Sequence, residues 1–96
     1  MPTHEELPRF LRDWERLGPQ QRQAFLGALS VLIAGLANRS FAPQLRIKRV
    51  QGEPHVWEMT WAADGRATFE YGAEVIAGQP HVIWRRIGTH DIFRRP

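Results

Sequence analysis

The end of the chain gathers residue types that could bind a phosphate and transfer a proton. The segment HVIWRRIGTHDIFRRP covers residues 81–96 and begins with apolar residues. Arg85, Arg86, His90 and Asp91 follow within seven positions. Guanidinium groups bind phosphate oxygens in a bidentate manner, and an imidazole with a pKa of roughly 6.5 suits proton transfer near neutral pH. The segment therefore predicts a phosphate site with an acid or base beside it.

Other polar residues of suitable type lie earlier in the chain. Arg46, Lys48 and Arg49 are close together, Glu58 follows, and Arg66 comes directly after an Asp-Gly pair. Chemistry at a phosphate requires a group that takes up a proton, a group that gives one and positive charge around the phosphate. These residues, with the C-terminal segment, could supply all three.

Each candidate also has a structural interpretation. Arg66 in a hairpin turn could be solvated, and Glu58 could pair with an arginine on a neighbouring strand. Arg85 and Arg86 alternate between the faces of a strand, so at most one faces a given site. Asp91 could orient His90, or it could cap a C-terminal turn by accepting backbone N–H groups.

Length and composition limit the class of protein. A chain of 96 residues forms one domain, residues 1–96, and the absence of cysteine excludes disulfides and thiolate metal sites. Twelve arginines and one lysine, Lys48, make up the 13 basic residues, and the net charge is +3. This bias suits nucleic acid, or it reflects a GC-rich genome. We expect a cytoplasmic protein with no membrane segment, no metal and no cofactor, because we find no signal sequence, no long apolar run and no metal-ligand spacing.

The first part of the chain has the period of helices. Apolar residues at helical spacing predict a helix over residues 7–17, and Gly18-Pro19 separates it from a second helix that extends to about residue 37. The short connection predicts an antiparallel helical hairpin.

From residue 45 onward, apolar and polar residues alternate with the period of two that is typical of strands. Alternating patterns predict strands over 45–48, 56–61, 66–71 and 81–87, with a turn or short helix after Thr89. Helices that precede strands indicate an α+β fold, in which the hairpin packs on one face of a mainly antiparallel sheet of about four strands. The other face would stay open and carry the basic residues. Trp57, Trp61, Phe69 and Trp84 are expected in the core, whereas a tryptophan exposed on the open face would be a platform for stacking a base.

The order of these segments resembles the RelE/ParE superfamily of bacterial type II toxins. The resemblance lies in LRIKRVQG, VWEMTWAADGRATFEYG and HVIWRRIGTHDIF and extends over roughly residues 7–93. It implies a RelE-like fold, a small antiparallel sheet against two helices. Many members cut mRNA in the ribosomal A site and are blocked by a cognate antitoxin, whereas ParE-type members inhibit DNA gyrase.

The resemblance also implies roles for individual residues. Arg66 lies where nuclease members have an arginine that contacts the scissile phosphate, and Arg46 and Lys48 match the basic strand, with Arg49 beside them. Arg85 or Arg86 matches the basic end of the last strand. His90 stands where a general acid or base is often found.

The chain departs from the family pattern at three places. Phe93 stands where many nucleases have tyrosine, so Lys48 or His81 would be the alternative acid. No glutamate matches the catalytic one that some members carry before the basic strand, where Gln44 lies nearby. Only Met1–Glu6 precedes the first helix, so we expect the first strand of the family to be missing. An antitoxin strand or a second copy of the chain could then pair with the exposed sheet edge.

Three functions agree with this pattern. The first is a metal-independent, ribosome-dependent mRNA endonuclease. The second is a non-enzymatic toxin that binds gyrase through its basic face. The third is a catalytically degenerate member that acts by binding a partner protein.

Overall fold

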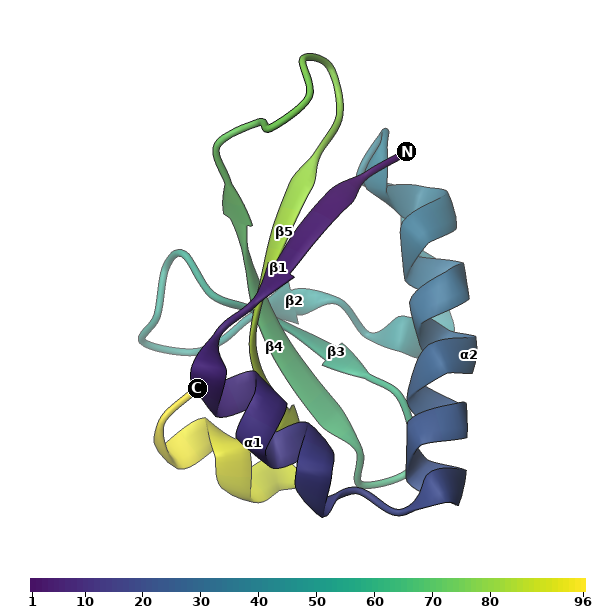
Figure 1. Ribbon diagram of the computed structural model, residues 1–96, viewed down its shortest axis with the longest axis vertical. Helices are drawn as coiled ribbons and strands as arrows, with labels where there is room; N and C mark the ends of the chain where they lie inside the picture. The colour runs from purple at the N-terminus through teal and green to yellow at the C-terminus, as the bar shows by residue number, and fades with distance from the viewer.

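A computed structural model describes all residues from 1 to 96 (Figure 1). Its strands and helices are, in chain order, β1 (Thr3–Glu6), α1 (Pro8–Arg16), α2 (Pro19–Leu36), β2 (Lys48–Arg49), β3 (Trp57–Thr60), β4 (Arg66–Gly72) and β5 (His81–Gly88). Two short 3₁₀ helices, η1 (Pro43–Leu45) and η2 (His90–Arg94), complete the fold. The predicted α+β class is confirmed.

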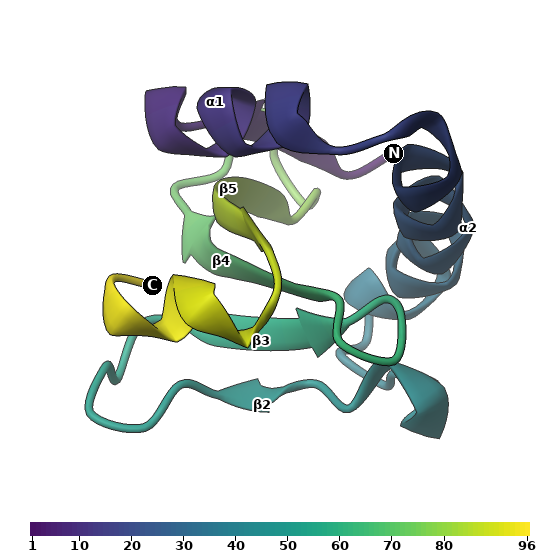
Figure 2. The same ribbon diagram turned by 90° about the horizontal axis from the view of Figure 1, so that it is seen from below.

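The strands form one mixed sheet in the order β1-β5-β4-β3-β2. Strand β1 is parallel to β5, and every other pair is antiparallel. Figure 2 shows β5, β4, β3 and β2 following one another below α1. The first predicted strand is shorter than expected, because Leu45 belongs to η1 and Arg46 has a left-handed backbone with φ 47°.

The prediction that a first strand is missing is wrong. Residues Thr3–Glu6 pair with His81–Trp84, and the backbone N–H of Leu7 donates to the Trp84 carbonyl at 2.9 Å. The sequence THEE has no apolar residue, so it lacks the alternation that marks a half-buried strand. The β5 edge from His81 to Trp84 is therefore covered by the chain itself, and the expected reason for an exposed edge there does not hold.

The two helices do not form the predicted antiparallel hairpin. Helix α1 lies beside β5, whereas α2 packs with its core residues on the face of the sheet (Figures 1 and 2). Leu17 and Gly18 are extended between the helices, with ψ 140° and 167°. The Arg22 side chain then donates to the Trp14 carbonyl at 3.0 and 3.2 Å, in addition to the hydrogen bond of 3.1 Å that this carbonyl accepts from the Leu17 N–H at the end of α1.

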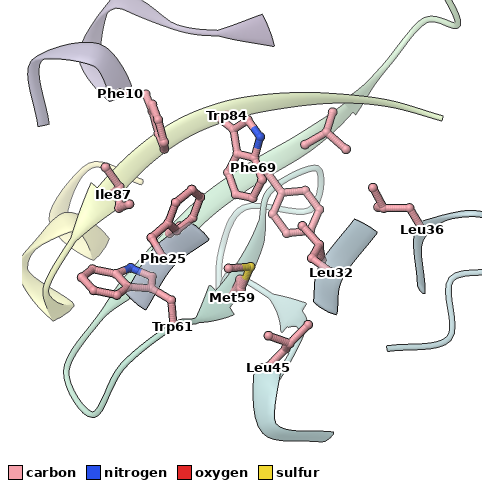
Figure 3. Packing of buried hydrophobic residues seen from close by; sticks show 12 residues of the cluster. Phe10, Phe25, Leu32, Leu36, Leu45, Met59, Trp61, Phe69, Trp84 and Ile87 are labelled. Carbon is pink, nitrogen blue, oxygen red and sulfur yellow. The ribbon is translucent and has the colours of Figure 1, made fainter. Parts of the chain in front are cut away.

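The core lies between α2 and the sheet and is rich in aromatic side chains (Figure 3). Phe25 of α2 meets Trp84 of β5 edge to face, with ring centroids 5.4 Å apart. Phe69 contacts Trp84 at the same centroid distance. Trp61, Phe69 and Trp84 are buried as predicted, and Trp57 is partly buried against the same cluster. Each fully buried aromatic side chain contributes about 1.5–3 kcal/mol of transfer free energy.

Asp13 holds α1 against β5 beyond the end of β1. Its Oδ2 accepts hydrogen bonds from Arg86 Nε at 2.6 Å and from the Ile87 backbone N–H at 3.1 Å, and its Oδ1 accepts from Arg86 Nη2 at 3.1 Å. Asp13 is only 8% exposed. Since β1 ends at Glu6, this carboxylate satisfies an edge N–H that no strand reaches.

Replacing Asp13 with alanine should lower the free energy of unfolding by about 3 kcal/mol, because it leaves Arg86 and the Ile87 N–H without their acceptor. Urea denaturation would measure the loss. Glu15→Ala, an exposed change on the same helix, should stay within about 0.5 kcal/mol of the unchanged protein. Equal stability of the two variants would contradict this role for Asp13.

Candidate functional site

A polar groove of about 630 Å³ lies between β2, β3, the start of β4 and η2. Six of the residues predicted from the sequence line it: Arg46, Lys48, Arg49, Glu58, Arg66 and His90. Phe93, Thr60, Gln51 and Val50 complete the walls. Folding therefore brings together candidate residues that the sequence separates by as many as 44 positions, from Arg46 to His90.

Lys48 and Glu58 are directly opposite each other on β2 and β3. Lys48 Nζ lies 3.9 Å from Glu58 Oε1, and the Glu58 side chain is only 13% exposed. The partner of Glu58 on β2 is therefore Lys48 and not one of the arginines considered from the sequence. At this distance the attraction is weak, so both groups are free to contact a ligand.

Arg46 and Arg49 reach the groove in different ways. The left-handed backbone of Arg46 follows η1, and its N–H donates to the Pro43 carbonyl at 3.1 Å. This conformation is uncommon for a residue other than glycine. The guanidinium of Arg49 lies 5.3 Å from the centroid of the Trp57 ring, a cation–π contact that restrains its side chain.

Arg66 is buried in the β3–β4 hairpin and is not a solvated turn residue. It is 8% exposed, and its Nη1 donates to the carbonyls of Gly65 at 2.9 Å, Ala62 at 3.3 Å and Ala63 at 3.4 Å. No group of the chain accepts a hydrogen bond from its Nε or Nη2. A desolvated guanidinium with free donors at the wall of a groove is suited to bind an anion.

His90 is held by a residue that the sequence analysis did not select. Its Nδ1 contacts Asp64 Oδ1, which lies in the turn of the β3–β4 hairpin. Asp64 was interpreted only as part of an Asp-Gly turn, and that motif was the one signal available in the sequence. This hydrogen bond lowers the pKa of Asp64. When Nδ1 carries the proton donated to Asp64, Nε2 is the nitrogen that remains for a substrate.

Asp91 does not orient His90 in this structure. The cap of η2 is Thr89, whose hydroxyl accepts a hydrogen bond from the Asp91 N–H at 3.3 Å. Of the turn or short helix predicted after Thr89, the structure has the short helix, and its cap is Thr89 in place of Asp91. Phe93 packs against the His90 ring at a centroid distance of 5.9 Å, so an apolar ring stands beside the imidazole.

The structure does not bring Arg85 or Arg86 into the groove. A register shift between Thr68 and Phe69 of β4 leaves Arg85 without a partner residue in the ladder. Arg85 Nη1 donates to Glu70 Oε2 at 2.6 Å, and Arg86 is paired with Asp13. His81, the alternative acid, lies at the opposite end of β5, where its Nε2 is 3.0 Å from Glu5 Oε1.

Two further structural findings concern membranes and metals. None of the helices combines the length and the apolar character needed to cross a bilayer. No three histidine, aspartate or glutamate side chains come close enough together to hold a metal ion.

Comparison with known proteins identifies the fold. No protein-family model matches the chain, and no curated protein sequence does. The solved structure of YafQ from E. coli strain BL21(DE3) superposes with a TM-score of 0.63 at 15% identity, over 95% of this chain and 96% of YafQ. YafQ in the E. coli DinJ–YafQ toxin–antitoxin complex gives 0.65 at 16% identity, over 94% and 93%.

A metal-bound toxin from Helicobacter pylori superposes with a TM-score of 0.63 at 17% identity, over 95% of this chain and 97% of that one. The three superpositions include nearly the full length of each chain. The chain therefore has the fold of these bacterial toxins, as the RelE-like prediction implied.

Replacing His90 with alanine should raise the pKa of Asp64 toward its ordinary value of about 3.9, because the imidazole is the main cause of the lowering. A lowered aspartate pKa favours the folded state above that ordinary value, and the contribution disappears as the pH falls through the folded-state pKa. NMR titration of the Asp64 carboxyl carbon would measure both values, with Asp64→Asn to identify the signal. Identical titration curves with and without His90 would contradict the contact.

Proposed function

We propose that this protein is the toxin of a bacterial type II toxin–antitoxin system and cleaves mRNA on the ribosome without a metal. The observation that carries the proposal is the groove, where a buried arginine with free donors faces the same space as an oriented imidazole. Exposed basic side chains surround both groups. The toxin fold supports the same conclusion.

Arg66 binds the scissile phosphate in this proposal. Negative charge grows on the non-bridging oxygens as the phosphate becomes pentavalent, and Nε and Nη2 of Arg66 are preorganised to receive it. Burial strengthens this interaction, since less water screens the charges. Arg46, Lys48 and Arg49 bind neighbouring phosphates of the RNA strand, a contribution that weakens as salt rises.

His90 and Glu58 carry the two proton transfers. Glu58 takes the proton of the 2′-hydroxyl as the 2′-oxygen attacks phosphorus, with the Lys48 ammonium 3.9 Å from its carboxylate. His90, oriented by the contact of its Nδ1 with Asp64, gives a proton from Nε2 to the leaving 5′-oxygen. The products are a 2′,3′-cyclic phosphate and a free 5′-hydroxyl. His90 thus performs the step for which Phe93 has no hydroxyl.

A cognate antitoxin is the proposed protein partner. YafQ, which shares the fold, has been solved in complex with DinJ. An antitoxin segment that neutralises the basic groove would block access of RNA to Arg66 and His90.

A function by binding alone is the second candidate. The observation that favours it is the apolar Phe93 ring, which occupies the groove without adding a proton donor. A toxin of this kind would use the same basic surface to bind gyrase or another target.

Arg66→Ala and His90→Ala should each reduce mRNA cleavage by about 100-fold or more, because each removes a group that acts in the transition state. Primer extension on cellular mRNA after induced expression would locate the cuts, and cleavage by the purified protein on ribosomes would measure the rate. Arg12→Ala, an exposed arginine on α1, is the matched control and should cleave normally.

Circular dichroism must show that Arg66→Ala is folded, because Nη1 of Arg66 also holds the hairpin. Full toxicity of both variants would refute the catalytic assignment. Intact mRNA together with a DNA-damage response would favour gyrase as the target instead.

A further inference from the structure

A second hollow, of about 530 Å³, adjoins the groove. It lies between α2 and the β3–β4 hairpin, and it shares Arg46, Thr60 and Arg66 with the groove. The two spaces therefore adjoin at Arg66. The two differ in character, since most residues around this second hollow are apolar.

Small and flat surfaces form its walls. Gly27 and Ala28 of α2 leave one side open, and the Trp61 ring lies on the other. Trp61 is fixed in place from two directions. Phe25 meets it edge to face at 6.4 Å, and a Cβ added at Gly65 would lie 2.6 Å from the indole, so the ring packs directly on the hairpin backbone. In Figure 3 Trp61 lies at the margin of the aromatic cluster, beyond Phe25.

Two of the residues that line the hollow and not the groove carry side chains that can form hydrogen bonds, Trp61 and Gln44. Trp61 is 8% exposed, yet its Nε1–H has no acceptor in the protein. Buried donors are rarely left unpaired, so this N–H is an unused donor in a residue that lines the hollow. The exposed amide of Gln44 stands beside the same hollow and can both donate and accept.

We propose that this hollow binds one nucleobase of the RNA, next to the phosphate that Arg66 holds. The inference rests on the proposed function and extends it to sequence preference. A nucleobase has apolar faces that suit the Trp61 side and a polar edge that suits an N–H donor and an amide. Its sugar and phosphate would continue into the groove through the shared residues. Trp61 and Gln44 would then determine which bases are accepted beside the cut.

Filling the hollow from Gly27 tests the proposal. No atom lies within 4 Å of a Cβ added there, so Gly27→Leu enters open space, and glycine is a poor helix former. Mapping the 5′ ends of cleaved mRNA would give the cut-site distribution. We expect the ratio between preferred and disfavoured sites to change about fivefold or more. Ser30→Leu adds the same side chain at an exposed position of α2 that lines neither space, and its distribution should be unchanged.

A binding measurement separates this inference from catalysis. The indole N–H signal of Trp61, identified with Trp61→Phe, should shift when a short RNA with 2′-deoxy sugars at the cut is added. The matched oligonucleotide that lacks one base at that position should not produce the shift. A wild-type cut-site distribution in Gly27→Leu overturns the base site and leaves the proposed function intact. An indole shift without any RNA cleavage supports the base site and refutes the endonuclease.

Discussion

The carboxylate of Asp13 takes the place of a strand at the edge of β5. Strand β1 covers only the first half of that edge, and Asp13 binds both Arg86 and the Ile87 N–H beyond it. Arg86 in turn donates to the Arg95 carbonyl at 3.0 Å. Because Arg95 directly follows η2, the same connection helps to place η2 across from the β3–β4 hairpin. The contact between His90 and Asp64 depends on that placement.

The arginines divide into two groups according to their partners. Arg22 caps α1, Arg85 pairs with Glu70, and Arg86 pairs with Asp13, so these guanidiniums are occupied by the fold. Arg46 and Arg49 are exposed beside the groove and remain able to meet phosphate. Net charge does not distinguish the two groups, because a paired and an unpaired arginine count equally. Of these arginines, only Arg46 and Arg49 add positive charge to the walls of the groove.

The region around Arg66 contains unpaired polar groups that lower the free energy of unfolding, which is typical of functional sites. Arg66 retains a buried charge with free donors, and Trp61 Nε1 and Thr68 Oγ1 are buried without partners. Each unpaired buried polar group costs about 1–3 kcal/mol. Arg66 lines both the groove and the adjoining hollow, and Trp61 lines the hollow. Thr68 is paired with Glu58 between β3 and β4. Such local conflicts are expected where binding a ligand supplies the missing partner.

The sequence by itself determined the α+β order, the aromatic core and the basic segments that meet in the groove. Helical and alternating periods depend on neighbouring residues, so α2, β4 and β5 could be predicted from them. Only the tertiary structure decided which polar groups pair. Thr3 meets His81 across 78 positions, His90 meets Asp64 across 26, and Asp13 meets Arg86 across 73. Such distant contacts fix the polar strand β1, orient His90 and keep Arg86 outside the groove. They leave no local periodicity in the sequence.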